Sequence, residues 1–206
     1  MLILPYCVLL TNSADKLPSK GVRDTRVHAQ DAGRLTVIYS EMEQNEIASD
    51  TFHQSALEFH HVVQAAFAGV AVIPFRFPTW LSKQEMAEHL EKESAGYQLF
   101  LTEHAEHVQM EFRVAAHPEQ GPASSGTEHL RMRADQLREV HKTAEELRNL
   151  LAADVVDWRE RNIAEGKRLF ALVERSRVAR FRERLSERGI RVTGPWPATE
   201  FLVAGG

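Results

Sequence analysis

The sequence predicts an α+β protein with a ferredoxin-like N-terminal domain, in which an antiparallel sheet carries two helices. A mainly helical C-terminal domain follows and ends in a small β-α-β unit. Two observations support this prediction. Strand-length apolar runs alternate with amphipathic helical stretches up to residue 115, and a Pro-, Gly- and Ser-rich stretch then precedes a long heptad pattern. We therefore expect domains at residues 1–117 and 127–206, joined by a linker at 118–126.

The first strands are expected close to the N-terminus. Leu2–Thr11 is a continuous apolar run of strand length, and Leu35–Tyr39 has the β-branched and aromatic composition of a second strand. Between them, Asn12–Gly33 is rich in Asp, Ser, Lys and Gly, which predicts an irregular connection. Cys7 is the single cysteine, so no internal disulfide is possible, and its apolar neighbours predict a buried packing residue.

A helix and a strand should follow. Apolar residues on one helical face begin at Phe52 and continue to Ala66, after candidate N-caps, and Gly69 is expected to end this helix. Val70–Phe77 predicts a buried strand that leaves the sheet near Pro74.

The second helix is predicted by a capping box, Ser82-x-x-Glu85, and the next strand by the alternation of apolar and polar residues in Val108–Ala115. The resulting order is β, β, α, β, α, β. Two helices against one face of a mainly antiparallel sheet is the economical arrangement of these elements.

The C-terminal domain is predicted to begin with one long helix, Thr127–Ala153, in which Leu130, Leu137, Ala144 and Leu151 recur every seven residues. This seam suits packing within the domain, which we favour, or an intermolecular coiled coil. A strand at Leu169–Val173 and a helix capped by Ser176 follow. A short strand at Ile190–Thr193 comes next, and Phe201–Val203 is a possible continuation.

Composition narrows the classes of function. The apolar runs are shorter than the ~20 residues of a membrane-spanning helix, and the start of the chain lacks the basic region of a signal peptide, so we expect a cytoplasmic protein without a membrane span. Residues 1–125 hold 9 Lys and Arg against 16 Asp and Glu, whereas residues 158–191 hold 11 against 5. The basic region could attract an acidic partner or nucleic acid. A solvated amphipathic helix is the simpler explanation, and no nucleic acid partner is expected.

The common signatures of enzymes are absent, including phosphate-binding loops, HExxH, GxSxG and paired CxxC motifs. His53, His60 and His61 lie close together in the sequence, as do His104 and His107, but no cysteine accompanies either group. We therefore expect no catalytic residue, no metal and no cofactor. A small-molecule or metal-binding regulatory domain is the alternative.

The segment Val192–Phe201 has an unusual composition. Two prolines flank Trp196, and Gly194 before them permits a turn that residues with side chains resist. A tryptophan held by such a turn suits either a corner of the core or an anchor for a binding partner, and the sequence leaves both open.

Three stretches resemble a known family, the gas vesicle proteins GvpF and GvpL. The family's C-terminal signature is similar to the run LFALVERSRVARFRERL followed by TGPWPATEF. Its first-domain motif resembles HHVVQAAFAGVAVIPFRFPTWL, and the start of its second domain resembles SGTEHL. The resemblance covers about residues 52–203.

This resemblance implies a non-enzymatic accessory or minor structural protein in gas vesicle assembly. Its partners would be the gas vesicle wall protein and other gas vesicle accessory proteins, and it would be found in the cytoplasm or with the gas vesicle. The residues expected to bind these partners lie in the two most specific motifs: Arg76, Phe77, Gly194, Pro195, Trp196, Pro197 and Phe201.

Overall fold

The computed structural model describes residues 2–11, 17–115, 126–164 and 166–202. It contains two four-stranded antiparallel sheets and four α-helices. The chain divides into two compact units, one formed by residues 1–106 and 197–206 and the other by residues 107–196. The prediction of a mixed α+β protein is confirmed.

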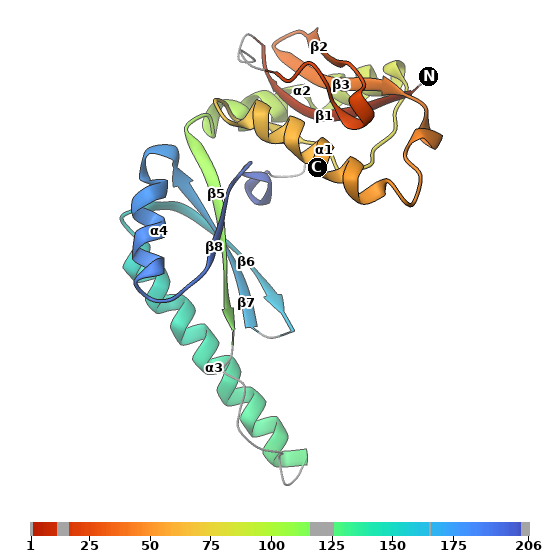
Figure 1. Ribbon diagram of the computed structural model, residues 1–206. Helices are drawn as coiled ribbons and strands as arrows, with labels where there is room; N and C mark the ends of the chain where they lie inside the picture. Colours follow the sequence, from red (N-terminus) through yellow and green to blue (C-terminus); the bar gives the residue numbers. More distant parts are fainter. Residues whose placement is uncertain (1, 12–16, 116–125, 165, 203–206) are drawn as a thin grey trace. The chain divides into compact units, whose positions relative to one another are not determined.

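The first unit contains a sheet in the order β2-β3-β1-β4 together with α1 and α2 (Figure 1). The bounds of its elements are β1 Leu2–Leu10, β2 Val27–Ala32, β3 Leu35–Met42, α1 Phe52–Phe67, β4 Ile73–Pro74 and α2 Lys83–Glu103, with short 3-10 turns at Val22–Asp24 (η1), Gln44–Glu46 (η2) and Thr199–Phe201 (η4). The central strands β1 and β3 are buried over almost their whole length, and Cys7 is fully buried as expected.

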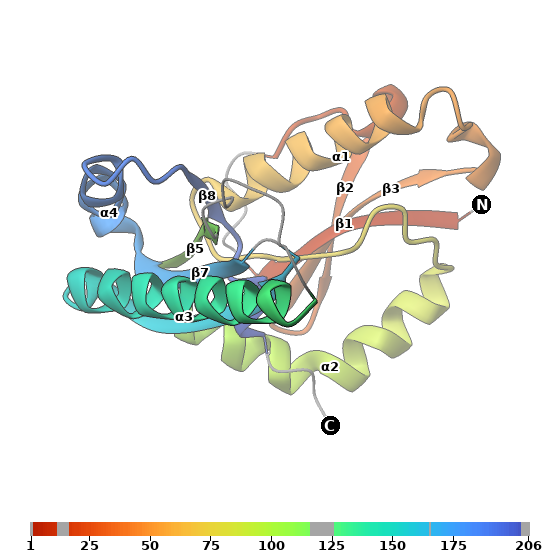
Figure 2. The same cartoon turned by 90° about the horizontal axis from the view of Figure 1, so that it is seen from below.

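The two helices lie on opposite faces of this sheet, which corrects the prediction that both lie on one face. Tyr6 donates a hydrogen bond to Ser40 of β3, and its ring contacts Phe59 of α1. The neighbouring Tyr39 instead lines a small hollow together with Met86 of α2. Successive residues of a strand point to opposite faces, so the sheet is sandwiched between α1 and α2 (Figure 2).

Two strands of the first unit differ from their predictions. The stretch predicted as irregular contains β2, which pairs with β3 through a two-residue turn at Gly33 and Arg34, where Gly33 has φ of +67°. The sequence did not predict β2 because its composition is polar. An edge strand leaves much of its surface in solvent and therefore needs few apolar residues. The strand predicted at 70–77 is reduced to β4, Ile73–Pro74, at the other edge, where the missing N–H of Pro74 is tolerated.

The second unit contains a sheet in the order β6-β7-β5-β8. The bounds of its elements are β5 His107–Ala115, α3 Gly126–Leu151, β6 Val155–Ile163, β7 Gly166–Glu174, η3 Arg175–Arg177, α4 Val178–Ser186 and β8 Val192–Trp196. The ring of Phe112 on β5 lies 6.2 Å from that of Phe181 on α4, and Arg184 of α4 donates a hydrogen bond to the Leu150 carbonyl of α3. Both helices therefore cover the same face of the sheet (Figure 1).

This unit corrects two predictions. The strand at 108–115 was expected in the first sheet, but β5 pairs with β7 and β8 in the second. The alternation of apolar and polar residues in β5 predicts which of its faces is buried, but it does not predict which strands pair with it. The unit is also less helical than expected, because β6 adds a mostly exposed, charged edge strand. The predicted linker 118–126 lies outside the described residues except for Gly126.

The ends of the predicted C-terminal elements also shift. Ser176 lies in η3 and does not cap α4, whose N-cap residue is Arg177. The last strand begins at Val192 and continues through Pro195 to Trp196, and Phe201 belongs to a 3-10 turn where a resumed strand was expected.

Among the described side chains of the long helix α3, the buried ones lie in its C-terminal half. Ala144 and Leu151 are buried, whereas Leu130 is 68% and Leu137 50% exposed, although all four lie on the predicted seam. The favoured intramolecular packing therefore holds for half of the helix.

Candidate protein-binding surfaces

The turn around Trp196 is built into the edge of the second sheet. Trp196 is paired with Gln109 across β8 and β5, and its side chain is half-buried, with Nε1 3.5 Å from Oγ1 of Thr193. The tryptophan is therefore neither a fully buried corner nor a freely exposed anchor.

Gly194 has a strict structural role in this turn. Its φ of +112° is rare for residues with a side chain, and a Cβ at this position would lie 2.8 Å from the Gln109 carbonyl oxygen. The guanidinium of Arg182 on α4 donates a hydrogen bond to the Gly194 carbonyl, and the peptide bond to Pro195 is cis. The turn is thus held by α4 and β5 together.

Pro197 and Phe201 belong to the first unit, where both are buried, and Phe201 is only 5% exposed. A partner could not reach Phe201 directly. For these two predicted binding residues, the structure favours packing over direct contact.

Arg76 and Phe77 are adjacent but lie in different environments. The ring of Phe77 is half-buried, with its centroid 5.3 Å from that of Phe52 and 5.1 Å from that of Phe59, both on α1. Arg76 is exposed, and its carbonyl accepts a hydrogen bond from Thr79. Of the predicted binding residues, Arg76 is the one that is exposed.

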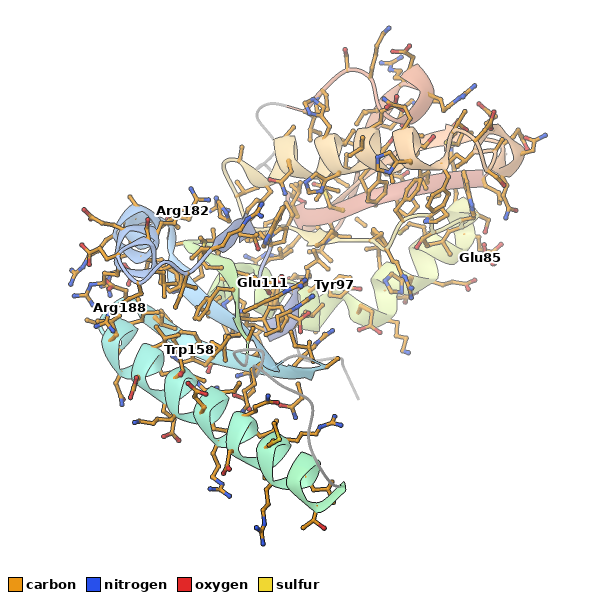
Figure 3. All side chains as sticks on the ribbon, turned by 60° about the horizontal axis from the view of Figure 1, so that its bottom comes forward. Glu85, Tyr97, Glu111, Trp158, Arg182 and Arg188 are labelled. Carbon is orange, nitrogen blue, oxygen red and sulfur yellow. The ribbon has the colours of Figure 1, made fainter. Side chains whose placement is uncertain are left out.

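The arginine-rich helix α4, where Figure 3 labels Arg182, uses several of its charges for structure. Asp154 is fully buried, and its two carboxylate oxygens each lie 3.3 Å from a guanidinium nitrogen, one of Arg180 and one of Arg184. These are ion pairs without well-directed hydrogen bonds, since both carboxylate oxygens lack a hydrogen-bond partner of proper geometry. Arg177 and Arg184 also donate hydrogen bonds to the carbonyls of Ala153 and Leu150 at the end of α3. This basic stretch therefore caps α3, as arginine at a helix C-terminus commonly does.

Sequence reasoning missed a hollow beside α1. It has a volume of about 640 Å³ and is lined on one side by η1 and on the other by α1. Arg23 and Asp24 in η1 have φ of +55° and +58°, and a carboxylate oxygen of Glu58 on α1 accepts a hydrogen bond from the Arg23 backbone at 2.8 Å. Consecutive left-handed residues without glycine leave no signal in the sequence.

The histidines do not form a metal site in the part of the chain that the structure describes. His53, His60 and His61 are exposed on α1, and no group of three or more potential ligands converges among the described residues. His89 instead contacts the Tyr97 hydroxyl at 3.0 Å, and burial raises the pKa of Tyr97. No described helix is both long enough and apolar enough to cross a membrane.

Comparison with known proteins gives consistent results. The family described as gas vesicle synthesis protein GvpL/GvpF matches residues 3–202. Among solved structures, the chain is similar to the gas vesicle protein GvpF from Anabaena sp. PCC7120, with a TM-score of 0.81 and 14% identity over 100% of this chain and 97% of that one. It is also similar to GvpF from Microcystis aeruginosa, with a TM-score of 0.77 and 10% identity over 98% and 99% of the two chains. Among curated protein sequences, none matches.

Proposed function

Because the chain belongs to the gas vesicle synthesis protein GvpL/GvpF family, which supports a role in gas vesicle assembly, we propose that it is a non-enzymatic accessory or minor structural protein. It acts by binding the gas vesicle wall protein or other gas vesicle accessory proteins. The match of the family to residues 3–202 is the observation that carries this proposal.

A physical requirement supports a binding role. A shell that holds gas needs subunits with a strongly apolar inner face, and such subunits associate wrongly through exposed patches and strand edges unless another protein covers them. A protein with two sheets and exposed apolar side chains, such as Leu130 and Leu137 on α3, offers surfaces for this purpose.

The predicted binding residues divide into direct and indirect candidates. Arg76 is exposed and Trp196 half-exposed, so both can touch a partner. Gly194 and Phe201 hold the shape of their surroundings, and their replacement would alter binding through the fold. Arg76 is therefore the best residue with which to test direct contact.

The first experiment is a co-expression pull-down of the full chain with the wall protein and the other gas vesicle proteins from the same genome. We expect at least one of them to be retained with the chain in soluble form. Failure to retain any of them, with the chain itself folded, would overturn the proposal.

A pair of variants then locates the contact. Arg76→Ala removes an exposed side chain and should leave the thermal unfolding midpoint unchanged while it reduces retention of the partner. The matched control is Arg34→Ala, which removes another exposed arginine of the same unit. Equal retention by wild type and Arg76→Ala would exclude Arg76 from the interface.

A further inference from the structure

The second sheet carries a row of arginines on the face opposite α3 and α4. Arg113 on β5 is directly opposite Arg168 on β7, and Arg168 is directly opposite Arg161 on β6. Directly opposed residues of antiparallel strands point to the same face. Phe112, the neighbour of Arg113, packs against α4, so the three arginines point away from the helices.

A fourth arginine, next to β8 at the opposite edge of the sheet from β6, extends the row. Val192 of β8 is opposite Phe112, which brings Arg191 beside Arg113, and both line a hollow of about 370 Å³ together with Thr193. The cross-strand arginine row, as we name Arg191, Arg113, Arg168 and Arg161, thus runs across β6, β7 and β5 to the residue that precedes β8. Adjacent strands are about 4.8 Å apart, so the backbones of neighbouring members of the row are separated by about that distance.

The protein itself neutralises only part of this charge. Arg168 lies 3.3 Å from a carboxylate oxygen of Glu111, and Arg161 lies over the ring of Phe170. Arg113 and Arg191 are exposed, and among the described residues neither has a carboxylate within ion-pair distance. Like charges directly opposite each other in a sheet are unfavourable, so the row costs stability that a bound anionic group would restore.

We propose that the cross-strand arginine row docks an acidic protein segment, a helix that carries carboxylates about one turn apart. The 5.4 Å pitch of an α-helix places such carboxylates close to the spacing of the strands when the helix lies across them. Arginine suits this role because its planar guanidinium binds carboxylates in a two-pronged geometry.

The same surface fits nucleic acid less well. Proteins that bind single strands offer exposed aromatic rings on which bases stack, but Phe170, the ring beside the row, is only 2% exposed. The carboxylate of Glu111, which pairs with Arg168 of the row, would repel a phosphate backbone. An acidic peptide can place its carboxylates away from Glu111.

This inference takes from the proposed function only the assumption that the partner is a protein. The test is therefore made with a synthetic probe and the purified full chain. The probe is a fluorescein-labelled alanine-rich helical peptide of about 18 residues with glutamates at i, i+4, i+7 and i+11, and fluorescence anisotropy measures its Kd. A second peptide carries glutamine in place of each glutamate.

We expect the glutamate peptide to bind and the glutamine peptide to bind far more weakly, with the difference shrinking as salt rises. Arg113→Ala/Arg191→Ala should weaken binding of the glutamate peptide about tenfold, since it removes two exposed ion pairs, each of modest strength. The matched control is Arg131→Ala/Arg133→Ala, which removes two exposed arginines from α3 and should leave the Kd unchanged.

Three outcomes would overturn the inference: no binding of the glutamate peptide, the same loss in both double variants, or single-stranded DNA of equal charge binding more tightly at the row. These outcomes are separate from the proposed function. A chain that retains a gas vesicle protein in the pull-down but ignores the glutamate peptide would keep the function and lose the docking surface.

Discussion

The ammonium of Lys167 lies 2.6 Å from a carboxylate oxygen of Glu160, and the two side chains are 7% and 35% exposed. Arg148 of α3 pairs with the other oxygen of the same carboxylate and lies over the ring of Trp158 (Figure 3). A nearly buried cation thus depends on a carboxylate at the rim of the helix-covered face. This arrangement also ties α3 to β6 and β7.

Glu160→Gln should lower the free energy of unfolding by about 1–3 kcal/mol, because it leaves the buried Lys167 without its counter-charge. Urea denaturation followed by circular dichroism measures the change. Glu183→Gln, at an exposed position of α4, is the matched control and should shift stability by less than about 0.5 kcal/mol. Equal effects of the two variants would show that the Lys167–Glu160 pair contributes nothing.

The same pair predicts a pH dependence. The hydrogen bond from Lys167, followed by that from Arg148, lowers the pKa of the Glu160 carboxyl. A carboxyl with a lowered folded-state pKa stabilises the fold above its unfolded pKa of about 4.3, and this contribution is lost as the pH falls through the folded pKa. The stability difference between wild type and Glu160→Gln should therefore be full at neutral pH and should shrink in acid. A difference that does not change with pH would contradict this assignment.

Gly194→Ala should destabilise the protein by about 1–3 kcal/mol, because φ of +112° is strained for alanine and the new Cβ would collide with the Gln109 carbonyl. Gly96→Ala in α2 is the opposite case. Its Cβ would meet nothing within 4 Å, and alanine favours a helix, so this variant should gain about 0.5–1 kcal/mol. Thermal unfolding of both variants, compared with wild type, tests the predicted loss of stability in Gly194→Ala and the predicted gain in Gly96→Ala.

Cys7 should not react in the native protein. It is fully buried, and burial raises the pKa of its thiol to about 12. Near neutral pH the thiol is therefore protonated, and a reagent cannot reach it. Alkylation with iodoacetamide at about pH 8 should modify Cys7 only after denaturant is added. Rapid labelling without denaturant would mean that the first sheet opens readily.

Arg113→Thr should increase stability slightly, by a few tenths of a kcal/mol, because it removes a like charge opposite Arg168 and introduces a residue with high strand propensity. Arg133→Thr on α3 is the control and should not stabilise, since threonine is a poorer helix former than arginine. Denaturation at low and high salt distinguishes the cause, because salt should diminish a gain that comes from reduced repulsion.

Local signals were read correctly where they depend on neighbouring residues. The capping box that begins α2 forms as predicted, with the Glu85 amide donating to Ser82 Oγ at 3.1 Å and the Ser82 amide donating to a Glu85 carboxylate oxygen at 2.7 Å. The backbone hydrogen bond also lowers the pKa of Glu85. The apolar run at Leu2–Leu10 also predicted β1, and the helical periodicity from Phe52 predicted α1.

Signals failed where the outcome depends on distant residues. β2 and β6 are polar edge strands, and a strand that buries little carries little apolar pattern. The binding residues expected from the motifs are also divided by burial, with Arg76 exposed and Phe201 buried, and sequence spacing does not encode that difference.

The sequence by itself determined the α+β class, the family and the main helices, because these follow from short-range periodicity and local motifs. The tertiary structure decided that β5 joins the second sheet, that α1 and α2 take opposite faces of the first, and that Arg191, Arg113, Arg168 and Arg161 form one row. Strand pairing is the physical reason. Alternation within a strand fixes which side chains share a face, but only hydrogen bonding between strands distant in the chain fixes which residues become neighbours.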